Sequence, residues 1–386
     1  MNNQAIKAYI RAIFAEYQQA SKKKKSELLN HAELATKRDR KVLIRKLNGS
    51  QDELTKKTSS GRPSQYNKQD LLPHIRYLWL QMERISAPRM KEAFADWLPR
   101  YHDCPAHLSL QLERMSASTL ERYLKEVRAS QRAFKGLATT SPARFMKNKV
   151  PINTLDAKIT KPGHVQTDTV AHCGTSMAGH FLSSITVTDV YSTWTENRSI
   201  SEKTGKAVAE MMKDIERSLP FDLIAINSDS GSEFLNKPML KYTHFGQRIA
   251  FTRSRPYKKN DNCYVEQKNF THVRELFGYD RFEDPKLVTL MNEIYTQYWN
   301  PLQNFFLPTF KLKEKIRVGS SIKKKHGKPQ TPYSRLINDE HLSDAQKEQL
   351  RTKKAELNPF ELKSKLEQKL QEFFDGVRKL NTRKAA

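Results

Sequence analysis

The chain has 386 residues, enough for two to four domains, and its 37% hydrophobic content supports at least one buried core. No stretch approaches 18 consecutive apolar residues, and the N-terminus lacks an apolar run with a small-residue cleavage site, so we expect neither a membrane span nor a secretory signal. Three widely spaced cysteines exclude a disulfide framework and a four-cysteine zinc site, which favours a reducing, cytoplasmic setting.

The formal charge of +26 is unevenly distributed along the chain. Residues 161–280 carry 15 Lys or Arg against 14 Asp or Glu, whereas residues 1–160 carry a net +16 and residues 281–386 a net +9. Basic flanks gain affinity for a polyanion by releasing its counterions, and a nearly neutral middle suits a site built from acidic residues. Nucleic acid is therefore the expected partner. On charge alone, the alternative is a generally basic soluble protein or a component of an RNA-containing particle.

Residues 1–130 are predicted to be helical, with an amphipathic helix over 1–20 and then three helix–turn–helix units. The units lie at 25–47, at 70–98 and around 115–124, and the last two each contain a serine before a new helix, as helix starts favour. Such units place the start of the second helix in the major groove of DNA. The alternative is a small helical bundle without DNA contact. Residues 131–160, rich in Ala, Ser, Thr, Pro and Lys, are predicted to be a linker.

The pattern changes to an α/β type over residues 161–308. Short β-like runs lie at 164–171, 181–190, 193–201, 223–227 and 249–253. Helical patterns follow at 204–219 and at 261–278, and the second ends at a glycine. Strands that alternate with helices in this way predict an α/β domain built around one sheet.

Three carboxylates are candidate catalytic and metal-binding residues. Asp168 lies inside the first strand, Asp229 follows the buried run 223–227, and Glu266 lies on the later helix. An Asp within a strand is costly unless it is paired or bound to metal, and α/β sheets usually hold ligands at the ends of their strands. The alternatives are a helix cap for Asp229, a buried ion pair for Asp168 and an ordinary surface glutamate for Glu266.

These motifs resemble the DDE integrase and transposase family, whose catalytic core is ribonuclease-H-like with a mixed sheet flanked by helices. Asp168 matches the family's first Asp, the segment Asp229–Phe234 matches its Asp-x-Gly-x-Glu-Phe pattern, and Glu266, after 36 intervening residues, matches its Glu. Residues 252–257 and 260–269 look like those of bacterial insertion-sequence transposases in particular. The resemblance is close over 160–280. The chain departs from retroviral integrases because it lacks their His/His/Cys/Cys zinc module, so metal is expected only at the active site.

The resemblance implies a DNA transposase that cleaves the 3′ ends of an insertion element and joins them to target DNA. Two Mg²⁺ ions, with Mn²⁺ as a substitute, would be bound by the three carboxylates. Asp168 would bridge both ions, Asp229 would hold one and Glu266 the other. Two such ions stabilise both the attacking and the leaving oxygen, and Mg²⁺ prefers oxygen ligands.

The implied partners are double-stranded DNA, as terminal repeats and as target, and further copies of the chain, because two element ends must be brought together. No membrane partner is expected. One alternative is a catalytically silent, transposase-derived DNA-binding regulator, against which the three intact carboxylates argue. Another is a ribonuclease or junction nuclease on the same core, against which the helix–turn–helix units argue.

Residues around Glu266 are candidate DNA contacts. A basic loop before the Glu266 helix would bind phosphates and stack on a base; its members are Arg253, Arg255, Tyr257, Lys258 and Lys259. A solvated loop is the alternative. Helix spacing places Asn262 and Asn269 on the face of Glu266, and Lys268 lies beside them.

Several other polar residues are interpreted as structural. Asp189 ends a predicted strand, and Glu233 is expected to cap or pair rather than bind metal. His172, Cys173 and His180 lack a fourth ligand, so ordinary packing is favoured over a metal cluster.

Residues 309–386 are predicted to form a basic C-terminal region. A strand at 311–318 followed by the cluster Lys323–Lys325 suggests a small β module, like the C-terminal barrels of the family. The aromatic helical stretch at 281–308 is expected to pack on the core. A helix starts at Asn358-Pro359, and its apolar stripe is expected to dock on its own chain rather than on a second protomer.

Overall fold

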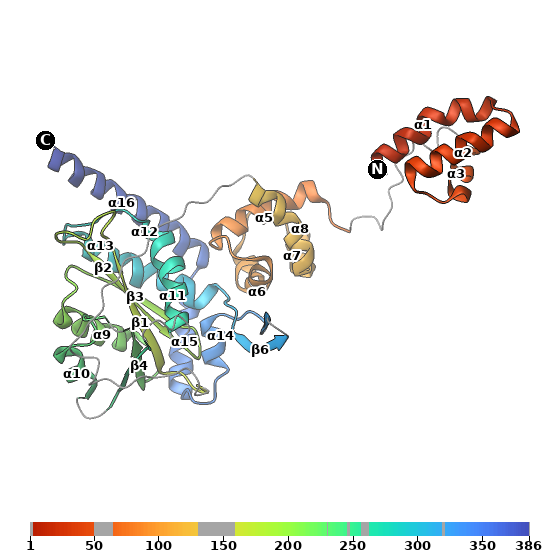
Figure 1. Cartoon of the computed structure of the whole chain (residues 1–386). Helices are drawn as coiled ribbons and strands as arrows, with labels where there is room; N and C mark the ends of the chain where they lie inside the picture. The colour runs from red at the N-terminus through yellow and green to blue at the C-terminus, as the bar shows by residue number, and fades with distance from the viewer. Residues whose placement is uncertain are drawn as a thin grey trace. The chain divides into compact units, whose positions relative to one another are not determined.

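The computed structural model describes residues 3–49, 65–129, 159–229, 231–244, 248–255, 262–318 and 321–385. The chain forms two compact units, residues 1–65 and residues 66–386 (Figure 1). None of the described helices combines the length and the apolar character that crossing a membrane would need. The predicted linker at 131–160 falls almost entirely outside the described residues.

The first unit contains three helices, α1 (Asn3–Gln19), α2 (Lys22–Thr36) and α3 (Arg40–Leu47). Three residues connect α2 to α3, and Asp39 begins α3 by accepting a hydrogen bond from Lys41 N at 2.8 Å. Apolar residues at three- and four-residue spacing give the unit its own core, which consists of Ile6, Ile10, Phe14, Tyr17, Leu29, Ala32, Leu43 and Leu47. This small core is sufficient to bring all three helices together.

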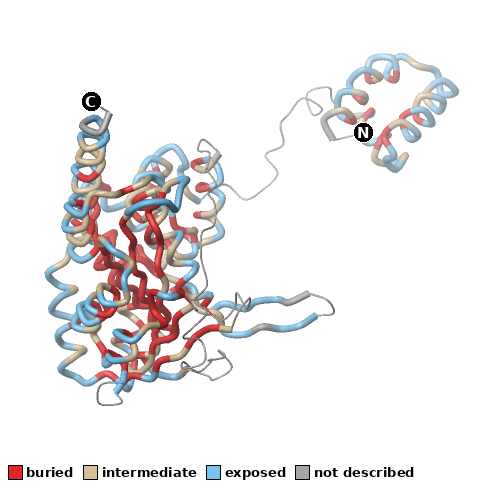
Figure 2. The backbone as a smooth tube through the Cα atoms, turned by 60° about the vertical axis from the view of Figure 1, so that its left-hand side comes forward, coloured by how far each residue is buried: buried red, intermediate tan, exposed pale blue. Residues whose placement is uncertain are grey.

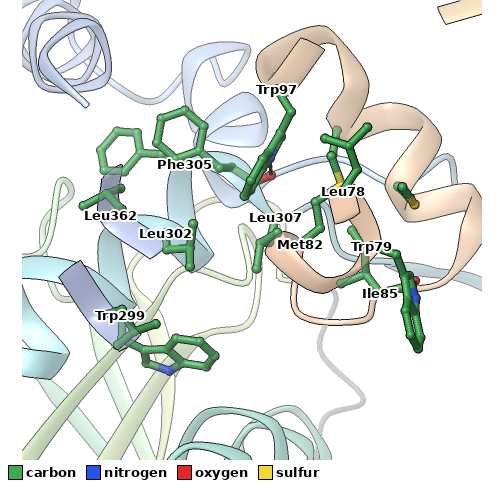
Figure 3. Packing of buried hydrophobic residues seen from close by; sticks show 14 of the residues in the cluster. Leu78, Trp79, Met82, Ile85, Trp97, Trp299, Leu302, Phe305, Leu307 and Leu362 are labelled. Carbon is green, nitrogen blue, oxygen red and sulfur yellow. Dashed lines mark hydrogen bonds between the residues drawn. The ribbon is translucent and has the colours of Figure 1, made fainter. Parts of the chain in front are cut away.

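The second unit begins with α5 (Lys68–Gln81), α6 (Ala87–Trp97), α7 (Ala106–Arg114) and α8 (Ala117–Ala129). These helices share one apolar cluster with the C-terminal part of the unit, so they do not form a separate core. Figure 3 shows Trp97 of α6 beside Phe305 and Leu307. Trp97 Nε1 donates a hydrogen bond to the carbonyl oxygen of Phe306 at 3.2 Å. The predicted division into domains at 130, 160 and 308 stays a prediction.

A five-stranded sheet occupies the centre of the second unit. Its strands are β1 (His164–Ala171), β2 (Ser183–Asp189), β3 (Thr195–Ile200), β4 (Ala225–Ser228) and β5 (Ala250–Arg253), in the spatial order β3-β2-β1-β4-β5. The first three are antiparallel to one another, whereas β4 runs parallel to β1 and β5 parallel to β4. This mixed order is that of the ribonuclease-H-like α/β core, and the predicted fold class is confirmed.

Helices cover both faces of this sheet (Figures 1 and 2). On one face α9 (Gly205–Ser218) and α10 (Lys237–His244) pack on Val165, Ile185 and Val187. On the other lies a nearly continuous helix of α11 (Cys263–Lys268), the π-helix η5 (Asn269–Arg274) and α12 (Glu275–Phe277). Behind it follow α13 (Leu287–Glu293) and two further π-helices, η6 (Ile294–Trp299) and η7 (Leu302–Phe306). The aromatic residues of 281–308 are buried there, as predicted.

After the core, β6 (Leu312–Val318) and β7 (Ser321–His326) form a two-stranded ribbon. Among the described residues no further strand joins this ribbon, so the predicted β module is a ribbon rather than a barrel. The chain ends with α14 (Pro332–Ile337), α15 (Asp344–Glu356) and α16 (Pro359–Ala385). Leu362, Leu366 and Phe373 of α16 are buried in the main cluster of the unit, which confirms docking on its own chain.

Candidate active site

Asp168 and Asp229 lie side by side at the centre of the sheet. The parallel register pairs Thr167 of β1 with Ser228, the last residue of β4. The next residue on each strand is therefore one of the two aspartates. Parallel neighbours bring their carboxyl ends to the same edge of a sheet, so the strand pairing itself juxtaposes the two carboxylates.

Hydrogen bonds attach the helix that carries Glu266 to β1 at two points, residues 264–265 and Asn269. The side-chain oxygen Oε1 of Gln166 accepts hydrogen bonds from Tyr264 N at 3.0 Å and from the next backbone amide at 3.4 Å. At the other end Asn269 Nδ2 donates to Asp168 Oδ2 at 2.7 Å. Gln166 and Asp168 are two residues apart and face the same side of the sheet. Helix α11 is thus held directly above the first aspartate.

Glu266 lies between these two attachment points, on the helix face shared by Asn262 and Asn269. Asn262 is buried and donates from Nδ2 to the Thr167 carbonyl oxygen at 3.5 Å. Glu266 itself is exposed. Among the described residues no three His, Cys, Asp or Glu side chains are gathered as ligands of one ion. The structure therefore brings Asp168 and Asp229 together and leaves Glu266 at the edge of the same site.

Burial and neighbouring acids raise the pKa of both aspartates. Burial, followed by repulsion from Asp229, raises the pKa of Asp168 to about 7, although hydrogen bonds from Thr169 N and Asn269 act in the opposite direction. Burial and the nearby Glu233 raise the pKa of Asp229, while the Gly231 amide and Lys203 lower it. Crowded carboxylates in a partly desolvated site favour either a proton or a cation between them.

Glu233 is a third acid near the two aspartates, and its Oε1 already has two partners. Its Oε1 accepts a hydrogen bond from Thr169 Oγ1 at 2.9 Å and pairs with Lys203 Nζ at 2.5 Å. A Cβ atom at Gly231 would lie 2.5 Å from Glu233 Oε2 and 2.9 Å from Asp229 Oδ1, so a larger residue there would displace both carboxylates. Glu233 pairs rather than caps, in agreement with its structural interpretation.

The donor atoms around Asp168 fit a hard cation. Asn262 Oδ1 and Asn269 Oδ1, on the face of the sheet that Asp168 occupies, are buried oxygens without a hydrogen-bond partner among the described residues. Together with two carboxylates they form an all-oxygen surrounding, which is what Mg²⁺ and Mn²⁺ prefer. Unsatisfied buried acceptors are costly, and a hydrated cation would satisfy them.

The predicted DNA contacts occupy three kinds of position. Arg253 is buried and is the last residue of β5, which agrees with the end of the predicted strand at 249–253, whereas Arg255 is half-buried. Tyr257, Lys258 and Lys259 lie outside the described residues. Lys268 is half-buried, with its Nζ 3.5 Å from His272 Nε2. Asn262 and Asn269 both contact β1, as described above.

The other polar residues are structural. The Asp189 carboxylate accepts hydrogen bonds from Gly163 N at 2.9 Å and from Ser192 N and Oγ, both at 2.6 Å, and closes the turn after β2. His172 is buried between Phe277 and Phe282, and its Nε2 lies 2.8 Å from Ser184 Oγ. Cys173 is buried and His180 is exposed, which agrees with packing and not with a metal cluster.

Three residues that support the candidate active site were not predicted from the sequence. Gln166 caps α11, Thr169 binds Glu233, and Lys203 neutralises Glu233. The alternation along β1 places Gln166 on the face of Asp168, and this was a usable signal. Lys203 precedes α9 in an ordinary polar segment, and nothing local distinguishes it from other surface lysines.

Comparisons with known proteins give a sequence relative and loosely superposed solved structures. No family model matches the chain. Similar solved structures include the catalytic core domain of BIV integrase, at 18% identity over 45% of this chain and 91% of that chain, with a TM-score of 0.27. A chain of the simian T-cell lymphotropic virus intasome in complex with the PP2A regulatory subunit B56 gamma is 16% identical, with a TM-score of 0.25. That match covers 45% of this chain and 56% of the intasome chain.

Because both superpositions are loose, the fold assignment rests on the strand order and directions of the chain itself. A sequence relative is closer. The uncharacterized protein y4rM of Sinorhizobium fredii is 31% identical over 268 residues, which cover 67% of this chain and 75% of the relative. The chain therefore belongs to the family of the Sinorhizobium fredii protein y4rM.

Proposed function

We propose that this protein is a DNA transposase that cleaves the 3′ ends of an insertion element and transfers them to target DNA. One observation carries the proposal. Asp168 and Asp229 adjoin at the carboxyl ends of paired parallel strands, and Asn269, from the helix of Glu266, binds Asp168 directly. An acidic pair in the middle of a basic chain is expected for an enzyme that binds a polyanion and works on it with metal ions.

Asp168, Asp229 and Glu266 are the residues proposed to bind two Mg²⁺ ions, with Mn²⁺ as a substitute. Bound there, the ions would supply activation of the attacking hydroxyl and stabilisation of the leaving oxygen. The chain's own residues prepare this site. Asn269 fixes the orientation of Asp168, and Lys203 neutralises Glu233 so that it does not compete as a ligand.

The proposed partners are the double-stranded terminal repeats of the element, the target DNA and further copies of this chain. The helical units of residues 1–130 are proposed to read the repeats. Arg253, Arg255, Tyr257, Lys258, Lys259, Asn262, Lys268 and Asn269 are proposed to contact DNA near the scissile bond. The proposed setting is the bacterial cytoplasm.

A second candidate is a catalytically silent DNA-binding regulator derived from a transposase. The observation in its favour is that Glu266 is exposed and not gathered with the two aspartates. If DNA binding does not draw Glu266 inward, the site holds two carboxylates instead of three. The two candidates therefore differ in activity and not in DNA affinity.

A strand-transfer assay separates them. Purified protein is incubated with the DNA that flanks its own reading frame and with a plasmid target, with and without Mg²⁺. The test variant is Asp229→Asn, and the matched control is Asp222→Asn, an exposed aspartate shortly before β4. Joined product that needs Mg²⁺, persists in the control and is lost in the test variant supports the transposase. Specific DNA binding with neither nicking nor joining in Mg²⁺ or Mn²⁺ would favour the regulator.

A further inference from the structure

The β6–β7 ribbon carries an unusual concentration of positive charge. Between Leu312 and His326 the sequence contains six Lys or Arg and one acid, Glu314. The described side chains from Lys313 to His326 are exposed, and Figure 2 shows the ribbon projecting from the body of the second unit. Ile316 and Val318, at 43% and 49% exposure, add apolar surface to the same strand.

Four lysines of the ribbon are not neutralised by any acid of the described protein. The one ion pair at the end of the ribbon joins Lys328 to Glu92 at 2.9 Å. Lys313, Lys323, Lys324 and Lys325 form no ion pair with a described residue. A lone two-stranded hairpin is marginally stable in water, and repulsion among its lysines weakens it further. Such a ribbon is best explained by a polyanionic partner that neutralises it.

The foot of the ribbon opens into a cavity of about 400 Å³ beside the helix of Glu266. Lys324 and His326 of β7 line it together with Arg89 of α6 and Lys268 of α11. By its register Arg317 lies on the same side of the ribbon as Lys324. Cationic side chains therefore continue from the exposed ribbon to the helix that carries Glu266.

The cavity offers hydrogen-bond donors that lack acceptors. Trp299 is only 2% exposed and lines the cavity, yet its Nε1 has no partner among the described residues. Arg89 donates from Nε to the Pro308 carbonyl oxygen, and its charge also interacts with Glu275, the acid beside it in the cavity. Of the two acids that line the cavity, Glu83 is paired with Lys363 at 2.5 Å. The remaining acid, Glu275, does not balance the cations, so the cavity favours an anion with several acceptor oxygens.

We propose that the β6–β7 ribbon and the cavity at its foot bind the phosphate backbone of duplex DNA and guide one strand toward the candidate active site. The six residues of β7 extend for about 20 Å, which corresponds to about six base pairs. The proposal rests on the proposed function for its choice of DNA as the polyanion. The charge and the unsatisfied donors are independent of that function.

The test uses the full-length protein, a fluorescent duplex of random sequence and no divalent metal. The ribbon variant is Lys323→Gln/Lys324→Gln/Lys325→Gln. The control variant is Lys206→Gln/Lys213→Gln/Lys365→Gln, which removes the same charge from exposed positions on α9 and α16. Affinity is measured by anisotropy over a range of salt concentrations, and thermal unfolding confirms that both variants fold.

The ribbon variant should bind the duplex roughly 10²-fold more weakly than the control at about 0.1 M salt, and its dependence of log affinity on log salt should fall by about three units. Hydroxyl-radical footprinting should show loss of protection over about six base pairs in the ribbon variant alone. Affinities and footprints that agree between the two variants would overturn the proposal. A loss on duplex RNA without a loss on DNA would overturn it as well.

The same two variants distinguish this proposal from the proposed function. A ribbon variant with weakened DNA binding, in a protein that joins no DNA with Mg²⁺, would leave the ribbon proposal standing and remove the transposase. If the wild type joins DNA with Mg²⁺ and both variants bind DNA equally, the transposase proposal stands and the ribbon proposal fails.

Discussion

The two helical regions of the chain follow the same local pattern but have different roles in the fold. Both α2–α3 and α5–α6 consist of two helices joined by a short turn, and both second helices begin at a polar residue, Asp39 or Ser86. The first pair closes its core within residues 1–65. The second pair shares its core with residues that lie 200 positions later, such as Phe306.

The difference arises from the size of the apolar residues and not from the turns. The first unit fills a three-helix core with medium-sized side chains, and its largest buried residues are Phe14 and Tyr17. Helices α5–α8 present Trp79, Phe94 and Trp97, which are too large for four short helices to bury alone. Local pattern therefore specifies helices, whereas apolar area decides which helices fold as an independent unit.

The largest effect is expected from Trp97→Ala. Trp97 is fully buried, packs edge-on against Phe360 at 4.9 Å and donates to the Phe306 carbonyl. Its loss should lower the free energy of unfolding of residues 66–386 by about 3–5 kcal/mol, because it leaves a cavity and an unsatisfied carbonyl. Thermal unfolding should show this loss while the transition of residues 1–65 stays in place. Leu110→Ala on α7, where the leucine is 52% exposed, is the control and should change little.

Leu43→Ala should have a smaller effect, confined to the first unit. Leu43 is fully buried in α3, and truncation of a buried leucine costs about 2–4 kcal/mol. The control in the same unit is Leu34→Ala, since Leu34 is 80% exposed. Calorimetry should show one weakened transition and one unchanged transition. If both transitions shift together, the two units are not independent and the comparison fails.

Acid should destabilise the two units unequally. Complete burial lowers the pKa of His172 to about 3, so the folded protein binds fewer protons than the unfolded chain below pH 6.5. Stability is therefore fully present above pH 6.5 and is lost as pH falls toward 3, by about 2 kcal/mol at pH 5. His172 belongs to the second unit, whereas the only histidine of the first unit, His31, is exposed.

His172→Phe should remove this contribution and make the acid dependence of the second unit shallower, as measured by urea unfolding at several pH values. The buried His272, whose pKa is also lowered well below its usual value, remains in the variant. Phe282→Leu thins the same aromatic cluster but retains His172, so it should lower stability equally at each pH. If both variants keep the wild-type slope between pH 6.5 and 5, His172 is not the source of the acid sensitivity.

The strands of the sheet were predicted well because each strand is specified by the pattern of apolar and polar residues within its own segment. The predicted strand at 164–171 coincides with β1, and the other strands agree to within a few residues. The position of Asp229 beside Asp168 follows from the parallel pairing that the fold class requires. The bond from Asn269 to Asp168 was not predictable, because it depends on how α11 approaches the sheet across 101 residues. Arg253 ends the predicted strand at 249–253 and is also the last residue of β5, so the basic loop that follows begins after it.

The smallest effect on stability, and the sharpest test of the comparison, is expected from Lys41→Gln/Arg45→Gln on α3. Both side chains are exposed on a helix whose opposite face is buried, so the stability of the first unit should change by less than about 0.5 kcal/mol. If the proposed function holds, binding to the DNA that flanks the reading frame should weaken, with the salt dependence lowered by about two units.

The control for this pair is Lys22→Gln/Lys23→Gln, which removes the same charge from exposed positions at the start of α2. The basic residue in the first turn of α6 is Arg89, whose guanidinium binds the Pro308 carbonyl oxygen inside the second unit. Arg89→Gln should therefore reduce stability as well as DNA affinity, by about 1–3 kcal/mol for a lost charged hydrogen bond. Equal DNA binding by the α3 pair and its control would mean that an exposed basic helix after a tight turn does not suffice to identify a DNA-reading helix in this chain.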